Sequence, residues 1–312
     1  MSLISIITPC YNEELCIVEC YDRVKTILNT QLSEYQYEHI FCDNASTDST
    51  VELLKKIASK DKNVKIIINS RNFGPMRSNF NGVLAASGDA VIVFMPADLQ
   101  DPPELIPTFI QKWKEGYKVV YGVRAERDEF FVMRAIRKMY YRLVAILSGV
   151  AIPVDAGDYQ LIDKQVLNEL KKHDDYYPYM RGMIANCGFK SIGIPYRWTV
   201  RHAGMTKNRM YHLVDQGLNG IISFSNVPLR ICMIMGFIIA VASLGYSFVQ
   251  LLLGIIYYQK LATPGITTLI VALFFFSGVL LFFIGLLGEY IGAIHQQVRK
   301  RPMVIEEDRI NF

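Results

Sequence analysis

Several signatures of common nucleotide-binding and extracellular proteins are missing from this sequence. It has neither a Gly-x-Gly-x-x-Gly fingerprint nor a Gly-Lys-Ser/Thr loop, which argues against dinucleotide-binding proteins and phosphate-loop ATPases. Its six cysteines show no paired or metal-type spacing, so we expect reduced thiols in a cytosolic domain. A net charge of +4 is too small to indicate a nucleic-acid partner. No basic segment precedes the first apolar run, so we expect no cleaved signal peptide.

Hydrophobic residues make up 51% of the chain and are concentrated near its C-terminal end. Residues 1–226 alternate short apolar runs with charged segments, which is typical of a cytosolic α/β domain. Residues 229–258 and 266–294 each exceed the ~20 apolar residues that cross a bilayer. They predict a hairpin of two transmembrane helices followed by a cytoplasmic tail at 295–312, with buried core helices as the alternative.

The charges around the predicted hairpin indicate its orientation. Arg230 begins the first apolar block, Arg299-Lys300-Arg301 follow the second, and the connection at 259–265 carries only Lys260. Because positive residues are retained on the cytoplasmic side, we expect a multi-pass protein of the inner (cytoplasmic) membrane with its catalytic domain in the cytoplasm.

Residues 130–150 combine one apolar face with arginines and a lysine on much of the remainder. This pattern predicts a helix in the membrane interface, although a helix packed on its own domain gives nearly the same pattern. Residues 211–225 are a second candidate for an interfacial helix, leading into the first span.

Short apolar runs alternate with helical patterns in the first hundred residues, which implies a largely parallel sheet covered on both faces. The predicted strands are Leu3–Thr8, Glu38–Cys42, Val64–Ile68 and Val91–Met95. Polar clusters follow three of them, at Pro9–Glu14, at Asp43-Asn44 and at Asp98 to Asp101. Parallel strands place these clusters along one rim, where a nucleotide can bind. Oxygen ligands at this rim suit a hard cation such as Mg²⁺ or Mn²⁺, for which we select Asp98 and Gln100.

Several ordered motifs together carry a resemblance to a known family. They are Thr8-Pro9-Cys10-Tyr11-Asn12-Glu13-Glu14, Asp43-Asn44-Ala45-Ser46-Thr47-Asp48, Asn72-Phe73-Gly74, Ala97-Asp98-Leu99-Gln100-Asp101-Pro102-Pro103-Glu104, Val120-Tyr121-Gly122-Val123-Arg124, Asp155-Ala156-Gly157-Asp158-Tyr159, Met180-Arg181-Gly182 and Leu287-Gly288-Glu289-Tyr290-Ile291-Gly292. The sequence resembles the family 2 glycosyltransferases, and most closely their polyprenyl-phosphate branch, which includes bactoprenol glucosyltransferases and dolichol-phosphate mannose synthases.

This resemblance implies a GT-A-type, Rossmann-like fold, a divalent metal, a nucleotide-diphosphate sugar donor, a polyprenyl phosphate acceptor and inversion at the anomeric carbon. It implies UDP-glucose as the donor, with UDP-N-acetylglucosamine, UDP-galactose or GDP-mannose as alternatives. The positions matching the family's nucleotide-sugar loops are Pro9, Tyr11, Asn12, Glu13, Asp43, Asn44, Ser46, Asn72, Gly74, Arg77, Ala97 and Asp98.

The chain departs from the family's pattern at three positions. Asn44-Ala45 stand where relatives usually have Asp-Gly, Pro96 replaces the first aspartate of the metal motif, and Pro75 replaces a frequent lysine. We nevertheless expect activity, because Asp98 and Gln100 point the same way if the segment is extended. On the same geometry we predict that Asp101 caps the following helix.

Transfer to a phosphate acceptor needs a positioned nucleophile more than a strong base, because the second pKa of a phosphate monoester is about 6. Asp158 matches the position that the family uses near the acceptor, so we assign it acceptor orientation or base assistance. A turn cap around Gly157 is the alternative. The candidate phosphate contacts are Arg124, Arg181, Arg201, His202 and Lys207.

We therefore expect a membrane-anchored glycosyltransferase, in a homo-oligomer, that makes a lipid-linked sugar for cell-envelope or O-antigen glycosylation. A polysaccharide synthase is one alternative, but the Gln of its Gln-x-x-Arg-Trp motif is missing before Arg197-Trp198. A catalytically impaired membrane scaffold that binds nucleotide sugars is the other, suggested by Pro96.

Overall fold

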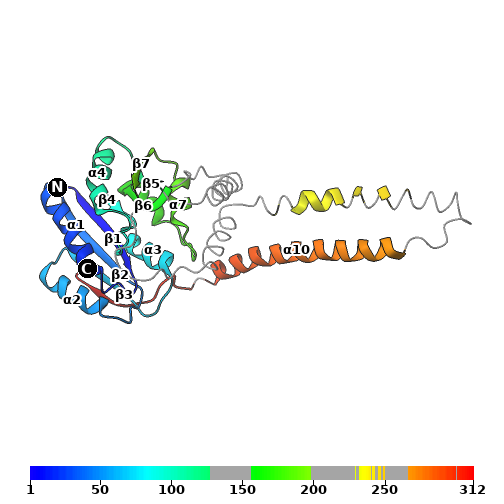
Figure 1. Ribbon diagram of the computed structural model, residues 1–312, viewed down its shortest axis with the longest axis horizontal. Coiled ribbons are helices and arrows are strands. Elements are labelled where there is room, and N and C mark those ends of the chain that lie inside the picture. Colours follow the sequence, from blue (N-terminus) through cyan, green and yellow to red (C-terminus); the bar gives the residue numbers. More distant parts are fainter. Residues whose placement is uncertain are drawn as a thin grey trace, which may run out of the picture. The chain divides into compact units, whose positions relative to one another are not determined.

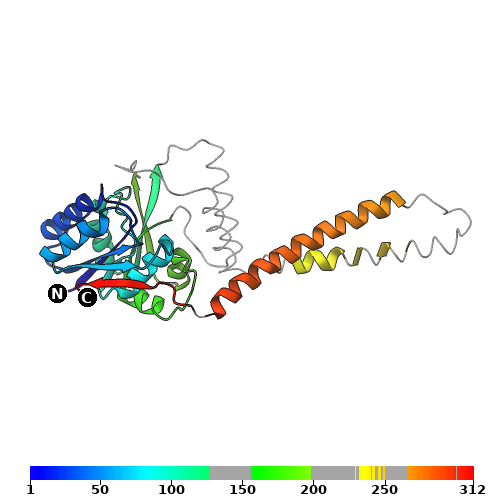
Figure 2. The same ribbon diagram turned by 90° about the horizontal axis from the view of Figure 1, so that it is seen from below.

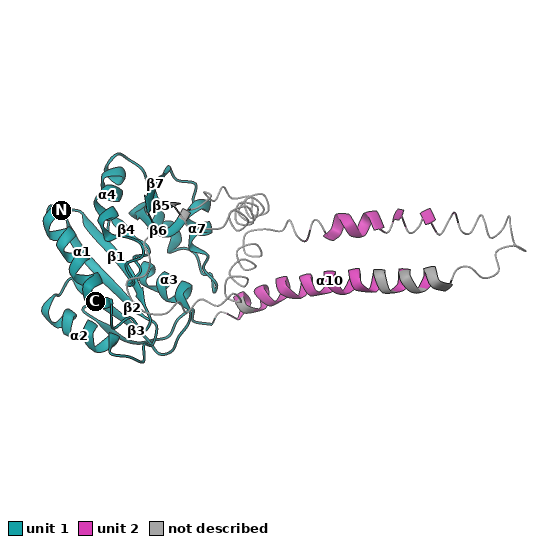
Figure 3. Ribbon diagram, viewed as in Figure 1, with its two compact units in different colours: residues 1–146, 150–220, 300–312 teal, residues 147–149, 221–299 magenta. Residues whose placement is uncertain are grey.

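The computed structural model describes residues 1–126, 156–197, 266–299 and 301–312, together with residue 229 and parts of 232–249. The chain divides into two compact units (Figure 3). One comprises residues 1–146, 150–220 and 300–312, and the other comprises residues 147–149 and 221–299.

The first unit is built on a sheet whose described strands have the order β7-β5-β6-β4-β1-β2-β3-β8 (Figure 1). Four strands at its centre, β4, β1, β2 and β3, run parallel, which confirms the predicted mostly parallel sheet. β6 is antiparallel to both β4 and β5, and β8 is antiparallel to β3. The strands are β1 (Leu3–Cys10), β2 (Gln36–Asp43), β3 (Val64–Asn69), β4 (Ala90–Ile92), β5 (Val119–Glu126), β6 (Ala156–Asp163), β7 (Ser191–Arg197) and β8 (Glu306–Ile310).

Helices cover both faces of this sheet. Alternation along β1 shows the two layers, because Ile4 and Ile6 belong to the core beneath α1 and α4, whereas Ile7 faces α3. α2 packs on the same side as α1, against β3. The helices are α1 (Ile17–Gln31), α2 (Thr50–Lys60), α3 (Pro75–Ala85), the short η1 (Pro103–Leu105), α4 (Ile106–Lys114), α6 (Lys164–Leu170) and α7 (Met180–Asn186).

The C-terminal tail contributes an unexpected edge strand, β8, drawn in red in Figure 2. Its pairing with β3 is extended by a hydrogen bond from Ser70 N to Ile305 O at 3.0 Å. Asn311 then donates from Nδ2 to the carbonyl oxygens of Ala58 and Val64 at 2.9 and 2.8 Å. A charged strand of this kind leaves an edge unsuited to pairing with further chains.

The described part of the second unit is dominated by α10 (Ile266–Val298). Within it, Phe276–His295 is long and apolar enough to cross a bilayer by length and composition, and it is the one such stretch among the described residues. Of the first predicted span, 229–258, most residues lie outside the described part, and residues 232–239 are helical. The predicted interfacial helices at 130–150 and 211–225 also lie outside the described residues.

Candidate active site

Four loops at the carboxyl ends of β1, β2, β3 and β4 each contain one residue with positive φ. These residues are Asn12 (φ 53°), Ala45 (61°), Gly74 (88°) and Leu99 (58°). The left-handed region costs an L-residue other than glycine roughly 1–2 kcal/mol. Such strain persists only where the surroundings enforce it, and it gathers at ligand-binding sites. Three of the four non-glycine residues with positive φ in the described part of the chain therefore lie at the rim predicted from the sequence.

The loops after β1 and β2 are braced against each other. Asn12 N donates to Ser46 Oγ at 2.9 Å, and Thr47 N donates to Asn12 Oδ1 at 2.7 Å. Glu13 N donates to Thr50 Oγ1 at 2.9 Å. The predicted donor-binding residues Asn12, Glu13 and Ser46 thus form one rigid corner.

Asp43 lies beneath this corner and is fully buried. Burial raises the pKa of its carboxyl group, although hydrogen bonds to Ser46 oppose the shift. Asp43 Oδ2 accepts from Ser46 N at 2.9 Å, so the carboxylate shapes the loop.

Asn44, one of the departures from the family pattern, is the centre of an amide network. Its Oδ1 accepts from Phe73 N at 2.9 Å and from Asn69 Nδ2 at 3.2 Å. Its Nδ2 donates to Asn72 Oδ1 at 2.9 Å, and that oxygen also accepts from Gly74 N at 2.9 Å. A carboxylate at position 44 has no donor for Asn72, so the amide explains why asparagine suits this chain.

The remaining predicted donor contacts differ in how far they are exposed. Pro9 and Tyr11 are partly exposed, whereas Ala97 is buried. The Arg77 guanidinium lies over the rings of Tyr176 and Tyr177, 4.9 and 5.1 Å from their centroids. These cation–π contacts place an aromatic wall beside the start of α3.

The metal motif is a turn, so our expectation of an extended segment is wrong. Leu99 N donates to Pro96 O at 3.3 Å, and Gln100 N donates to Asp98 Oδ1 at 3.2 Å. The buried Leu99 side chain, 2% exposed, packs into the core and holds the left-handed conformation in place. Across the described residues no cluster of three or more acidic, histidine or cysteine side chains is suited to a metal. One carboxylate still fits Mg²⁺ or Mn²⁺, because Mg²⁺ commonly takes one or two carboxylates and completes its shell with substrate phosphates and waters.

Asp101 does not cap a helix, contrary to our prediction. η1 begins after Pro102 without any side-chain cap, and Asp101 is 1% exposed. Arg124 Nη2 donates to both of its carboxylate oxygens at 3.1 and 3.2 Å, and the Tyr196 hydroxyl donates to Oδ1. A polar side chain this deeply buried needs such hydrogen-bond partners.

Gly122 allows Tyr196 to reach this cluster. A Cβ atom at position 122 would lie 2.7 Å from the Tyr196 ring, so only glycine fits without moving the ring. Arg124 Nε completes the triangle by donating to the Tyr196 hydroxyl oxygen at 3.1 Å. Sequence reasoning did not select Tyr196, because nothing in its local pattern distinguishes it from a packing tyrosine.

Asp158 and Arg181 form the second carboxylate–arginine pair. Arg181 donates from Nε to Oδ1 and from Nη2 to Oδ2, both at 2.6 Å, and each side chain is 21% exposed. Burial alone would raise the pKa of Asp158, but Arg181 and the nearby Arg124 hold it below its ordinary value. An ionised, paired carboxylate is a weak base and a good orienting group for a guanidinium.

The structure therefore brings Asp101, Arg124, Asp158 and Arg181 together at the same rim. The predicted acceptor contacts Arg201, His202 and Lys207 lie outside the described residues.

Comparison with known proteins identifies the family of the chain. Residues 5–171 match Glycosyl transferase family 2, and residues 227–294 match the GtrB C-terminal hairpin. The chain belongs to glycosyl transferase family 2. It is therefore a glycosyltransferase, as the motifs predicted.

Relatives of this family 2 enzyme cover nearly its whole length. The glycosyltransferase YkcC of Bacillus subtilis is 38% identical over 96% of this chain and 92% of its own. A prophage bactoprenol glucosyl transferase homolog of Escherichia coli is 33% identical over 97% of both chains. Among solved structures, glucosyl-3-phosphoglycerate synthase of M. tuberculosis is 17% identical, with a TM-score of 0.47 over 71% of this chain and 78% of that one.

Proposed function

We propose that this glycosyltransferase transfers glucose from UDP-glucose to a polyprenyl phosphate, giving a lipid-linked sugar for cell-envelope or O-antigen glycosylation. The observation that carries the proposal is the Asp158–Arg181 pair beside the donor loops, since it presents a guanidinium that the Asp158 carboxylate holds in a fixed orientation. Relatives described as bactoprenol glucosyl transferases, at 32–33% identity over nearly the full chain, support the same substrate class.

The proposed reaction is a single displacement. An acceptor phosphate oxygen forms a bond to the anomeric carbon while the bond from that carbon to the donor diphosphate breaks, which inverts the configuration. No proton has to be removed from the nucleophile, because the acceptor phosphate is largely ionised above its second pKa of about 6. Arg181, oriented by Asp158, binds the acceptor phosphate, and Arg124, held by Asp101 and Tyr196, adds positive charge beside it.

A divalent metal, held by Asp98 and Gln100, would neutralise the charge that develops on the leaving diphosphate. The donor itself is bound by the loops of Asn12, Asn44 and Asn72, whose geometry is fixed before the nucleotide arrives.

We place the two predicted spans in the inner membrane, with the catalytic unit in the cytoplasm and only residues 259–265 outside. The apolar stretch within α10 and the hairpin match at 227–294 support this arrangement. A homo-oligomer remains part of the proposal. To test the topology, an impermeant thiol reagent added to intact cells is expected to label a Thr263→Cys variant. Cleavage near Arg299 by external protease would contradict the proposed topology.

The deciding experiment uses the purified full chain in detergent with undecaprenyl phosphate and a panel of labelled nucleotide sugars. Label is expected in the extracted lipid with UDP-glucose, and EDTA is expected to abolish it. Donor binding without transfer to lipid would instead favour the scaffold interpretation. Long, lipid-free polymer would favour a polysaccharide synthase.

A further inference from the structure

A small cavity borders the Asp158–Arg181 pair. Its volume is about 10 Å³, and both members of the pair line it, together with Asn79 of α3 and Gln160 of β6. The rest of its wall is largely apolar and comes from Met76, Val93, Phe94, Met180 and Ile184. A space of this size accommodates one water molecule and no larger ligand.

Asn79 brings an unpaired polar atom to this cavity. Its side chain is 2% exposed, and its Nδ2 donates to Val93 O at 3.0 Å. Its Oδ1 accepts no hydrogen bond from any group of the described residues. Because buried amide oxygens are almost always paired in native proteins, this atom indicates a partner that is not a protein side chain.

We propose that one water molecule occupies the cavity, accepts a hydrogen bond from Arg181 and donates to Asn79 Oδ1 and Asp158. Three polar partners are typical of a buried water. Asn79 is then a positioning residue, which holds the Arg181 guanidinium through the water without touching either substrate. This role rests on the function proposed above, in which Arg181 binds the acceptor phosphate.

Because Asn79 lies on α3, the water also links the acceptor site to the donor loop. α3 begins directly after Gly74, within the loop that the Asn44 network holds. The water therefore joins the helix that starts at the donor loop to the residue that binds the acceptor. We expect its loss to reduce turnover and weaken use of the lipid phosphate, while leaving donor binding unchanged.

Kinetics of the full chain in detergent test this role with three variants. Asn79→Leu removes the amide and fills the space, and it is expected to lower kcat about tenfold with an unchanged KM for UDP-glucose. Asn79→Ser keeps a hydroxyl for the water and should recover most of that loss. Met76→Leu changes only an apolar wall residue at similar volume and should behave as wild type.

Wild-type kinetics in Asn79→Leu would overturn the proposal. So would equal losses in Asn79→Leu and Asn79→Ser accompanied by equal falls in melting temperature, because that result indicates a purely structural role.

A crystal structure of the full chain tests the water without any reliance on activity. Density for one water within hydrogen-bonding distance of Asn79 Oδ1 and Asp158 is expected in the wild type and not in Asn79→Leu. An empty cavity in well-ordered density would overturn the proposal. If the wild type transfers no sugar to lipid but holds this water, the proposed function fails and the water site stands.

Discussion

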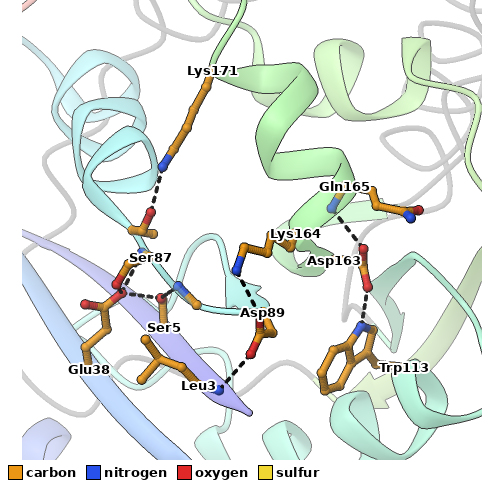
Figure 4. A network of polar contacts seen from close by, with 12 residues as sticks. Leu3, Ser5, Glu38, Ser87, Asp89, Trp113, Asp163, Lys164, Gln165 and Lys171 are labelled. Carbon is orange, nitrogen blue, oxygen red and sulfur yellow. Dashed lines mark hydrogen bonds and ion pairs between the residues drawn. The ribbon is translucent and has the colours of Figure 1, made fainter.

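Carboxylates at the amino ends of the central strands bind lysines, backbone amides and hydroxyl groups (Figure 4). Those at the carboxyl ends, Asp101 and Asp158, bind arginines. At the amino ends, Glu38 accepts from Ser5 Oγ, from Lys65 Nζ and from both the backbone and the hydroxyl of Ser87, at 2.5–2.9 Å. Asp89 likewise accepts from Leu3 N and Lys164.

The turn before β4 also differs in its backbone from the loops at the carboxyl rim. The turn before β4, residues 86–89, contains no positive φ, while each of the four described loops at the carboxyl rim contains one. The carboxylates at the amino end accept hydrogen bonds from lysines, hydroxyl groups and backbone amides, and those at the rim hold arginines that a phosphate can also bind. Equivalent substitutions at the two ends should therefore separate stability from turnover.

The largest effect is expected from Asp158→Asn. The neutral amide no longer fixes Arg181, so kcat should fall about 100-fold, as expected when a reacting group is misplaced by about 1 Å. The KM for the donor should change little, because the donor loops do not involve Asp158. Steady-state kinetics with saturating lipid measure both quantities, and an unchanged kcat would refute the assignment.

Asp163→Asn is the matched control at the other end of the sheet. Asp163 accepts hydrogen bonds from Trp113 Nε1 at 2.7 Å and from Lys118 Nζ at 3.0 Å. Neither partner is among the residues proposed to bind a substrate. This variant should lower the melting temperature and leave kcat close to wild type. A comparable loss of kcat would show that the two ends are not functionally distinct.

Glu38→Gln should affect stability most among the amino-end substitutions. Burial alone would raise the pKa of Glu38, but Lys65 and the Ser5 and Ser87 hydrogen bonds hold it below its ordinary value. Losing hydrogen bonds to a buried charge costs about 2 kcal/mol. Because the pKa of Glu38 is lower in the folded than in the unfolded protein, its ionised carboxylate stabilises the fold fully above the unfolded pKa near 4.5. This stabilisation is lost as the pH falls through the folded pKa.

Thermal unfolding between pH 7 and pH 3 measures this effect. The difference in melting temperature between wild type and Glu38→Gln should be largest near neutral pH and should decrease as the pH is lowered. A difference that stays constant down to pH 3 would mean that Glu38 is not the source of the acid dependence.

Tyr196→Phe should have a moderate effect on turnover. It removes the hydroxyl shared by Asp101 and Arg124, and one hydrogen bond to a charged group is worth about tenfold in kcat if Arg124 contacts the acceptor. Tyr159→Phe is the control, because its hydroxyl only reaches Pro102 O at 3.3 Å. Equal losses in both variants would indicate general loosening of the core instead of a role for Arg124.

The sequence predicts the parallel half of the fold well and the tertiary polar contacts poorly. The first four strands and their polar ends follow from local patterns, and so does the rim that they share. β8 was missed because Glu306–Ile310 is charged and shows no alternation of apolar residues. The pairing of Asp101 with Arg124 and Tyr196 depends on chain segments far apart in sequence, so no local rule reveals it.

Leu99 illustrates the same limit at a single residue. Its neighbours suggested an extended metal motif, but burial of the leucine side chain in the core imposes the left-handed turn. Asn44 is the opposite case. The sequence shows that asparagine replaces the family's usual aspartate, but only the structure explains why, because the amide hydrogen-bonds to Asn72 and Phe73 and so orders their loop.

The smallest expected effect comes from Ala45→Gly, at the strained rim. Glycine relieves the left-handed strain, worth roughly 1–2 kcal/mol, but loses part of this gain through its greater freedom when unfolded, roughly 0.5–1 kcal/mol. The net stabilisation of about 0.5 kcal/mol corresponds to a melting temperature about 1–2 °C higher. Ala86→Gly is the control at the other end, where φ is −66° and no strain is relieved, so it should lower the melting temperature. Opposite signs in the two variants would confirm that the Ala45 conformation is strained, whereas destabilisation by both would show that this conformation costs less than its φ of 61° implies.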